Sequence, residues 1–388
     1  MKVYHFMITL VAAFFIAGST AGIAHAGGFS KGGHGSGYCT KTARILYQAC
    51  YFDVLDDYNE TRANCTNVVD EDDRQDCFAA LKGSLRDEWE GCRDQKDARE
   101  DVCDLIGEAR YADPLMDPDI TFIDPDSIGD EYEPNQYLNM TVGHTYVLRA
   151  GEDFEETVIV HVTDEVREAE GADEDEPVLC RVVVDAVMVF EEDEDEGTSE
   201  WVVDELTDDY FAQDDTGIVY YCGEISRNYE DDYLDNLDGS FFSGVEHAKA
   251  GVLMRQAPEV GQVDRQEYAI AEAEDLVEYL DLNATPDDGD EGGENLNDPS
   301  FACAGDCLKT FDSSALDPES TEFKYYKEDI GFVLATSMQD GEFDGEREEL
   351  VCVGDSLDIL STPACGLSQV DELLEKLCEL SPQAFCTD

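Results

Sequence analysis

The chain has 388 residues, of which 93 are Asp or Glu and 24 are Lys or Arg, giving a formal net charge of −69. A charge of this sign argues against nucleic acid and anionic membrane surfaces as partners, and it favours divalent cations, basic proteins and cationic surfaces. The 42% of hydrophobic residues is typical of a folded protein, and the length predicts two domains. The acidity has two open explanations, which are adaptation to a saline or alkaline habitat and specific cation binding.

Residues 1–26 have the pattern of an export signal peptide. Lys2 precedes an apolar stretch over residues 6–17, and Ala24-His25-Ala26 matches a small-x-small cleavage site. The alternative is an uncleaved membrane anchor, but the apolar stretch is shorter than the ~20 residues that span a bilayer. Because no other segment approaches this apolar length, no stable membrane insertion is expected after cleavage. We therefore predict a secreted protein, extracellular or at the cell surface, with the periplasm as the alternative. Residues 27–37 follow as a glycine-rich lead.

Six of the 14 cysteines are spaced symmetrically within residues 38–110, so that the gaps between them are the same when counted from either end. Apolar residues at helical spacing lie on both sides of an acidic turn at residues 70–73, which predicts an antiparallel helical hairpin. An even number of cysteines in an exported chain favours disulfides over metal thiolates. Of the 15 connectivities that six cysteines allow, the symmetry predicts three nested bonds: Cys39–Cys103, Cys50–Cys92 and Cys65–Cys77.

The remaining cysteines carry no comparable pattern, and their pairing stays open: Cys180, Cys222, Cys303, Cys307, Cys352, Cys365, Cys378 and Cys386.

The rest of the chain predicts a connector, a β domain and a short tail. Residues 111–138 contain three Asp-Pro steps and one Glu-Pro step, which disfavour helix and predict an extended connector. Alternating or Val-rich segments at 157–163, 180–190 and 217–222 predict strands of a mainly antiparallel sheet within residues 139–355. Residues 356–388 are expected to form a helical tail with three cysteines. The predicted fold class is α+β.

Short segments in the second half of the chain carry a resemblance to a known family. They are 135–138 (NQYL), 142–146 (VGHTY), 209–215 (DYFAQDD), 220–224 (YYCGE), 239–244, 251–254 (GVLM), 265–268 (RQEY), 273–275, 307–310 (CLKT), 316–318, 324–326 and 330–331. In their order and spacing, residues 135–355 resemble a family of uncharacterised secreted bacterial proteins. The resemblance implies a β-rich exported domain, and it implies no catalytic residues.

Two acidic segments have the ligand spacing of a calcium-binding loop. Asp340, Glu342 and Asp344 occupy positions 1, 3 and 5, with glycine at position 6. The glutamate that an EF-hand has at position 12 is missing, and flanking helices are not expected, so a simple acidic hairpin turn is the alternative. The second candidate site consists of Asp287, Asp288 and Asp290. Calcium is accordingly the expected cofactor.

No motif specifies catalysis, so we expect that the protein is not an enzyme. The chain has no nucleophile elbow, zinc-protease helix, phosphate loop or Rossmann fingerprint, and close carboxylate pairs are too frequent among 93 acids to single out a dyad. His161 is expected at an ordinary position within a strand. Arg265 and Glu267, on one face of an expected strand, are interpreted as a structural ion pair. The alternative is a polar ligand pocket that includes Glu274 and Asp275.

We therefore expect an exported structural or binding protein that recruits divalent cations, and that assembles at the cell surface with further copies of itself or with basic proteins. Two alternatives stay open, a carrier that holds an apolar ligand in a curved sheet and a hydrolase of unknown type. An apolar cavity lined by the inward residues of 158–162 and 182–189 would favour the carrier. A cleft with His247 beside a carboxylate and a serine would favour the hydrolase.

Overall fold

A computed structural model describes residues 37–151, 154–173, 176–193, 198–230, 233–286 and 300–386. The chain divides into two compact units, a helical unit up to Tyr111 and a β-rich unit that starts at Ala112. The fold is α+β, with two N-terminal helices joined by disulfides and a large antiparallel sheet, as the sequence predicts. Among the described residues, the helices are too short or too polar to cross a bilayer.

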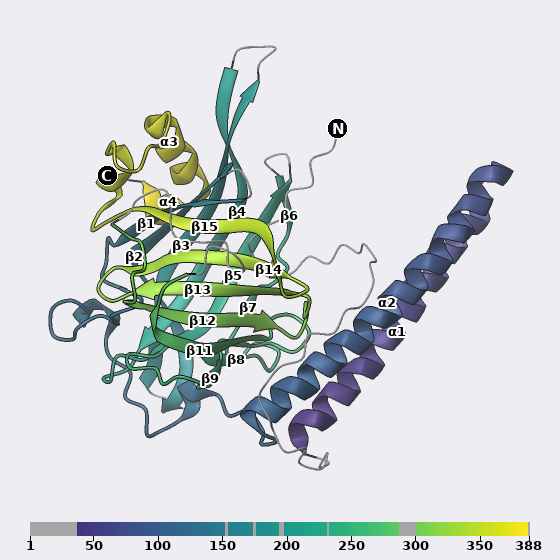
Figure 1. Cartoon of the computed structure of the whole chain (residues 1–388), viewed down its shortest axis with the longest axis horizontal. Coiled ribbons are helices and arrows are strands. Elements are labelled where there is room, and N and C mark those ends of the chain that lie inside the picture. The colour runs from purple at the N-terminus through teal and green to yellow at the C-terminus, as the bar shows by residue number, and fades with distance from the viewer. Residues whose placement is uncertain are drawn as a thin grey trace. The chain divides into compact units, whose positions relative to one another are not determined.

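The helical unit is an antiparallel hairpin of α1 (Tyr38–Asn67) and α2 (Glu71–Ile106) (Figure 1). Asp70 begins α2, because its side chain accepts hydrogen bonds from the backbone N–H groups of Asp72 and Asp73 at 2.9 and 3.2 Å. Such a cap satisfies backbone donors that have no partner within the helix, and the acidic first turn complements the helix dipole. The acidic segment at residues 70–73 therefore starts the second helix.

Three disulfides join the two helices, and they connect the cysteines that the symmetric spacing pairs. Their Cα–Cα separations are 5.6 Å for Cys39–Cys103, 5.8 Å for Cys50–Cys92 and 5.6 Å for Cys65–Cys77. All three lie within the ~7 Å limit of a disulfide, although helices without such bonds usually pack 8–10 Å apart. The bonds therefore hold the helices closer together than ordinary packing does.

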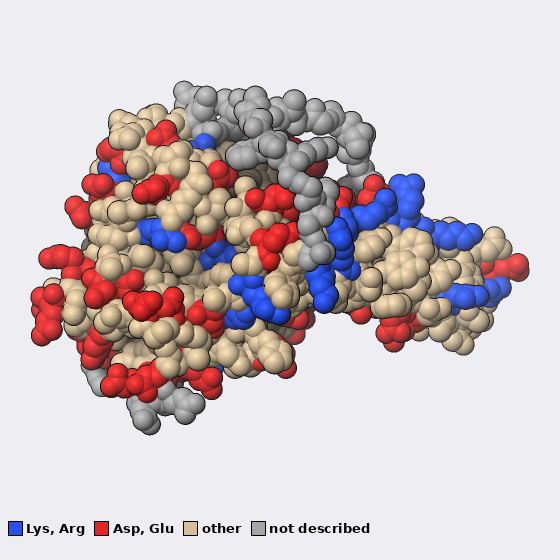
Figure 2. Space-filling model, turned by 90° about the horizontal axis from the view of Figure 1, so that it is seen from below, with Lys and Arg blue, Asp and Glu red and all other residues tan. Residues whose placement is uncertain are grey.

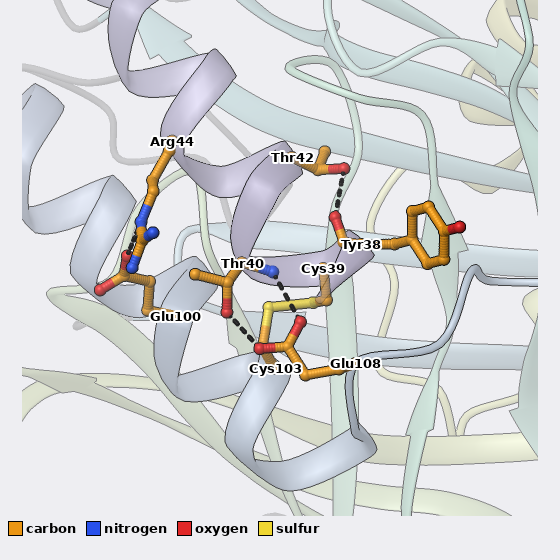
Figure 3. Close-up of a disulfide and its surroundings, with 8 residues drawn as sticks. All are labelled: Tyr38, Cys39, Thr40, Thr42, Arg44, Glu100, Cys103 and Glu108. Atoms are coloured by element: carbon orange, nitrogen blue, oxygen red, sulfur yellow. Dashed lines mark hydrogen bonds and ion pairs between the residues drawn. A yellow bond between two sulfur atoms is a disulfide. The ribbon is translucent and has the colours of Figure 1, made fainter. Parts of the chain in front are cut away.

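Figure 3 shows the open end of the hairpin, where the Cys39–Cys103 bond lies. The backbone N–H of Thr40 donates to Glu108 at 3.0 Å, and the Thr40 hydroxyl donates to the other oxygen of the same carboxylate. Arg44 pairs with Glu100 at 3.2 Å, and its side chain is half exposed. Exposed ion pairs contribute little stability, so the cross-link and the Glu108 contacts hold this end together.

The β-rich unit is built on one sheet of 15 strands, and every pairing in it is antiparallel. The longer strands are β1 (Thr145–Ala150), β2 (Glu156–Asp173), β3 (Glu176–Asp193), β4 (Thr198–Gln213), β5 (Val219–Glu230), β8 (Lys249–Met254), β11 (Asp275–Ala284), β12 (Cys307–Ser314), β13 (Ser320–Lys327), β14 (Gly331–Gln339) and β15 (Glu342–Gly354). The short ones are β6 (Tyr233–Asn236), β7 (Phe241–Phe242), β9 (Val263–Arg265) and β10 (Glu267–Tyr268).

One short stretch of chain makes the sheet nearly barrel-shaped. The order runs from β8 through β5, β4, β3, β2, β1, β15, β14, β13 and β12 to β11. At its two ends β9 pairs with β11 and β10 pairs with β8, and only Gln266 separates β9 from β10. The chains are close here, because a Cβ atom on Gly251 of β8 would lie 2.1 Å from the carbonyl oxygen of Gln266. This approach requires glycine.

Helices α3 (Val370–Leu380) and α4 (Pro382–Phe385) lie beside one end of the sheet (Figure 1), and apolar side chains of the short helices join a core with residues of strands β2 to β5. Leu360 of η3 (Leu357–Ser361), Leu373 and Leu377 of α3 and Phe385 of α4 are fully or almost fully buried in this core. The expected extended connector contributes as well, since it forms the single-turn helices η1 (Pro114–Met116) and η2 (Pro125–Ser127) and buries Leu115 in the same core.

The eight cysteines whose pairing was open form four further disulfides. Cys352–Cys365 ties β15 to the tail, and the other three bonds are Cys378–Cys386, Cys303–Cys307 and Cys180–Cys222. Cys180 of β3 and Cys222 of β5 are joined although β4 lies between these strands in the sheet. The β4–β5 register shifts between Tyr210 and Phe211, next to this bond. No described cysteine is free.

Candidate functional site

The first predicted calcium segment forms the hairpin turn between β14 and β15. Asp340 and Gly341 have φ angles of 55° and 79°, which is the left-handed backbone of a two-residue β-hairpin turn. Asp344 accepts a hydrogen bond from the Ser337 hydroxyl at 2.7 Å, and Glu342 is exposed at the start of β15. The carboxylates lie along the strand and do not converge on one point. The segment is therefore the acidic hairpin turn expected from the sequence as the alternative to a calcium-binding loop.

The second predicted segment, with Asp287, Asp288 and Asp290, lies outside the described residues. Within the described ranges, no three His, Cys, Asp or Glu side chains form a group that could hold a metal ion. The first acidic segment, which lies within the described residues, therefore provides no formed cation site.

The inner face of the sheet carries an unexpected set of acidic side chains. On β3, Val184, Ala186 and Met188 belong to the helix-covered outer core, whereas Val183 belongs to a separate apolar cluster inside the sheet. Alternation along the strand places Asp185 on that inner face as well. It pairs with Val160 of β2 on one side and with Thr207 of β4 on the other. A carboxyl group thus interrupts an apolar strand on its inward side.

Cross-strand register brings further carboxyls onto this face from six other strands, while Glu267 of β10 reaches the same space. The strand pairs β4–β5, β11–β12, β12–β13 and β14–β15 fix which side chains share the inner face. The carboxyl groups on this face also interact electrostatically with one another. We call this set the interior acidic cluster: Asp185, Glu205, Asp209, Glu224, Glu267, Asp275, Asp312, Glu322 and Glu348.

A tyrosine joins two members of the cluster. The Tyr221 hydroxyl group contacts Asp209 and lies 2.8 Å from a carboxylate oxygen of Glu224. Burial raises the pKa of Glu224 well above its usual value, and the nearby Asp209 carboxylate raises it further. Burial also raises the pKa of Asp209 to about 7, and the hydrogen bond from Tyr221 limits this rise. A single hydroxyl proton is therefore shared between two crowded carboxyl groups.

Lys324 of β13 is the base within the cluster. Its Nζ lies 3.2 Å from Asp312 and 3.1 Å from Glu322. Burial alone would lower the pKa of Lys324, but these two carboxylates raise it well above its usual value. The ammonium therefore stays charged and neutralises part of the negative charge on this side. Asp312 is further fixed by a hydrogen bond from the Thr310 hydroxyl at 2.6 Å.

Glu267 is a member of the cluster with a buried carboxyl oxygen that has no hydrogen-bond partner among the described residues. This oxygen is Oε2, and Glu267 is only 2% exposed. Burial raises the pKa of Glu267 well above its usual value, and the carboxylates of Asp275 and Glu224 raise it further. Asp275 is 8% exposed and also has a buried oxygen, Oδ1, without a hydrogen-bond partner. Buried acceptors of this kind are costly unless a proton, water or cation binds them.

Several members of the cluster titrate near neutral pH for the same reason. Burial raises the pKa of Asp275 and Glu348 to about 7, and it raises the pKa of Asp185 well above its usual value. Asp185, Asp209 and Glu348 are nevertheless only half-buried. Part of each residue is therefore accessible to solvent, although the residues lie on the inner face of the sheet. In the absence of a cation, part of the cluster is protonated at neutral pH.

Three histidines, His144, His161 and His247, lie within the described residues. His161 lies in β2, as expected, with its Nδ1 2.9 Å from the Thr145 hydroxyl, and burial lowers its pKa to about 4. His247 is exposed in a turn with a φ of 72°. His144 contacts the exposed carboxylate of Asp355 at 2.9 Å. Among the described residues, none of these contacts joins a histidine to both a carboxylate and a serine.

The polar segment at 265–275 divides between two environments. Arg265 ends β9, and its guanidinium lies 5.1 Å from the centre of the Tyr268 ring. Glu274 accepts a hydrogen bond from the backbone of Ala271 at 2.8 Å. Glu267 and Asp275, in contrast, belong to the interior acidic cluster. The polar pocket expected from the sequence as an alternative thus includes two of the nine residues of the interior acidic cluster, Glu267 and Asp275.

Comparison with known proteins adds little to this picture. No family model and no curated protein matches the chain. One similar solved structure is a putative lipoprotein from Parabacteroides distasonis, with 13% identity and a TM-score of 0.26, which covers 57% of this chain and 100% of that chain. Another is a putative exported protein with a YmcC-like fold from Bacteroides fragilis, with 12% identity and a TM-score of 0.22, which covers 57% of this chain and 98% of that chain. Likenesses of this size carry no functional argument.

Proposed function

We propose that the protein is an exported, non-enzymatic binding protein that takes up divalent cations, calcium foremost, in the interior acidic cluster. The observation that carries the proposal is the buried, unpartnered Oε2 of Glu267 beside the unpartnered Oδ1 of Asp275. Burial raises the pKa of both carboxyl groups, and neighbouring carboxylates raise it further. A cation removes the repulsion between these carboxylates and supplies the missing partner.

The charge balance favours a cation over full ionisation. A buried carboxylate is strongly destabilising unless it is paired or protonated. Lys324 pairs with two members of the cluster, whereas Asp209 and Glu224 share the single proton of the Tyr221 hydroxyl, and burial raises the pKa of both. Because a metal ligand must be deprotonated, cation uptake by this cluster releases protons and becomes stronger as the pH rises.

The geometry favours a partly hydrated ion. Among the described residues no three acidic, histidine or cysteine side chains form a ready metal-binding group, so a bound ion keeps some of its water ligands. Calcium accepts six to eight oxygen ligands in irregular and flexible arrangements, whereas magnesium requires a near-ideal octahedron. Carboxyls held on separate strands of a wide sheet therefore suit calcium better than magnesium.

The two alternatives gain less from the structure. The inward residues of the predicted carrier strands are Val158, Val160 and Val162 on β2 and Val183, Asp185 and Val187 on β3. A carboxyl therefore lies in the middle of an otherwise apolar wall. The residues between them on β3 pack in the helix-covered core. For the hydrolase, His247 lies in an exposed turn.

The proposal is tested by calorimetric titration of chelator-treated full-length protein at about pH 8, which is above the value of about 7 to which burial raises the pKa of Asp209, Asp275 and Glu348. We expect calcium to bind, and we expect the observed heat to depend on the ionisation enthalpy of the buffer because protons are released. Substitution of Glu267→Gln, which removes the unpartnered carboxylate and keeps the side-chain shape, is expected to weaken calcium affinity by about tenfold or more.

The matched control is Asp344→Asn, which also removes one negative charge but lies in the exposed β14–β15 turn. This variant should bind calcium like the wild type. The proposal is rejected if the wild type binds neither calcium nor magnesium, or if E267Q binds calcium as tightly as D344N does. Circular dichroism of both variants checks that the fold is retained.

A further inference from the structure

The charge of the chain is distributed unequally between its two units. Residues 38–106, which form the hairpin, contain nine Lys or Arg and 17 Asp or Glu, whereas residues 107–388 contain 13 and 76. Figure 2 shows Lys and Arg side chains gathered along the hairpin, whereas Asp and Glu are abundant on the visible face of the β-rich unit. The hairpin is therefore the part of the molecule that an acidic surface repels least.

The bases of α2 are concentrated on one side of the helix. Lys82, Arg86 and Arg93 are spaced four and seven residues apart, which places all three on one helix face over about 16 Å. All three are exposed. Lys82 has no ion pair among the described residues, and the contact of Arg86 with its neighbour Asp87 is a long one at 3.7 Å. The Nε of Arg93 donates to the backbone of Trp89 and not to a carboxylate.

Aromatic side chains lie beside these bases. Trp89 lies on the same face of α2, and its ring stacks on Tyr51 of α1 with 5.5 Å between ring centres. Phe52 contacts Tyr51 edge to face and is 66% exposed. We call the surface formed by Tyr51, Phe52, Lys82, Arg86, Trp89 and Arg93 the hairpin stripe. Exposed aromatic rings among arginines are typical of contact residues at the centre of protein interfaces.

We propose that the hairpin stripe is a docking surface for the acidic β-rich unit of a second copy of this chain. Charge complementarity identifies the occupant. Among the described residues, the bases of the stripe have no carboxylate partner other than the long Arg86–Asp87 contact, while residues 107–388 carry 76 acidic side chains against 13 basic ones. Such a contact is heterologous, since one copy presents its hairpin and the other its sheet. Repetition of a heterologous contact forms either a ring or an open filament.

Net charge alone would predict the opposite behaviour. Two copies with a charge of −69 each repel one another at long range. At physiological ionic strength the screening length is about 8 Å, so only charges near the contact determine whether the copies bind. The local pairing of the stripe with carboxylates then outweighs the distant repulsion.

The test is sedimentation velocity of the full-length protein in chelator at physiological salt, over a range of concentrations. Because the measurement contains no divalent cation, its outcome does not depend on the proposed calcium binding. We expect reversible self-association of the wild type and its loss in Lys82→Glu/Arg93→Glu. The matched control, Lys41→Glu/Arg62→Glu, changes two exposed hairpin bases outside the stripe and shifts the net charge equally. It should associate like the wild type.

A second measurement locates the contact. Carbodiimide joins a lysine to a carboxylate only when the two touch, and a mixture of ¹⁴N- and ¹⁵N-labelled protein distinguishes bonds between copies from bonds within one copy. We expect mixed-isotope peptides that link Lys82 to acidic residues beyond residue 107. The proposal is overturned if the wild type stays monomeric at high micromolar concentration, if both double variants associate equally, or if Lys82 forms links only within one copy.

Discussion

Tyr221 is the residue on which the interior acidic cluster most depends for a hydrogen bond. Its hydroxyl contacts Asp209 and Glu224, and it limits the rise in the pKa of both carboxyls. Substitution of Tyr221→Phe removes the hydroxyl and leaves the ring in the inner apolar core. Asp209 and Glu224 then have one hydrogen-bond donor fewer in a site that is shielded from water. The protonated forms of both carboxyls are therefore favoured further.

We expect Y221F to lower the free energy of unfolding by about 1–2 kcal/mol, and to raise the pH at which Asp209 and Glu224 ionise. Urea unfolding measures the first effect, and carbon-detected NMR titration of the side-chain carboxyls measures the second. Tyr132→Phe is the control, because Tyr132 is 40% exposed. Unchanged carboxyl titration in Y221F would show that the hydroxyl does not govern this pair.

Residues of the cluster also show where sequence reasoning reached its limit. Asp185 interrupts the apolar segment 180–190 (CRVVVDAVMVF), and this interruption was the available signal that a carboxyl faces inward. Glu224 interrupts a similar segment, residues 217–225 (GIVYYCGEI), whereas Glu348 lies among other acids in residues 342–349 (EFDGEREE) and carries no such signal. Which acids of an acidic chain point inward depends on strand register, and register is set by pairings between distant segments.

At the scale of elements, the helical hairpin was the most predictable part. Cysteine positions in two helices are related by fixed geometry, so that a symmetric spacing converts directly into a set of facing pairs. The strands followed from alternation and Val-rich composition. The Cys180–Cys222 bond could not be inferred, because it joins strands that are not neighbours in the sheet.

The hairpin disulfides give a prediction at the same scale. Peptide mapping without reduction should recover Cys39 linked to Cys103, Cys50 to Cys92 and Cys65 to Cys77. A peptide that links Cys39 to Cys50 would contradict the hairpin. Removal of the central bond by Cys50→Ser/Cys92→Ser should destabilise the hairpin by about 2–4 kcal/mol, because the bond closes a long loop of the unfolded chain.

Thermal unfolding followed by circular dichroism at a helix-sensitive wavelength measures this loss. The control is Cys303→Ser/Cys307→Ser, which removes a bond with a sequence separation of 4, in place of 42, and lies in the β-rich unit. This variant should leave the helical transition unchanged. Equal shifts in both variants would show that the two units do not unfold separately.

At the scale of the whole molecule, the closure of the sheet determines the chemistry of its interior. An open sheet would leave the inward carboxyls in water, where their pKa values would be ordinary. Gln266 connects the two strands that pair with opposite ends of the sheet, and closure encloses the cluster. The sequence predicted an antiparallel sheet and a strand that includes Arg265 and Glu267, but not this closure. The segment divides into β9 and β10, with 3 and 2 residues, and their partners β11 and β8 lie at opposite ends of the sheet.

The enclosed cluster predicts an unusual dependence of stability on pH. Burial raises the pKa of Asp209, Asp275 and Glu348 to about 7 and that of Glu156 to about 8, from ordinary values of 3.8 for aspartate and 4.5 for glutamate. A carboxyl with a raised pKa in the folded state binds its proton more tightly when folded. Its contribution to stability is complete below about pH 4 and is lost as the pH rises through the folded-state value.

We therefore expect the cation-free protein to be more stable at pH 5 than at pH 8, with the loss concentrated between about pH 4 and 8. Each unit of raised pKa corresponds to about 1.4 kcal/mol before solvent screening reduces it. Urea is the suitable denaturant because it is uncharged, and the midpoint is measured with chelator and with calcium. Calcium should restore stability at pH 8 and have little effect at pH 5, where protons already neutralise the cluster. Glu267→Gln should lose most of this calcium effect, whereas Asp344→Asn should keep it. A midpoint that rises steadily from pH 5 to pH 8 in chelator would show that the interior carboxyls ionise like those in water, and that the enclosed sheet does not hold them protonated.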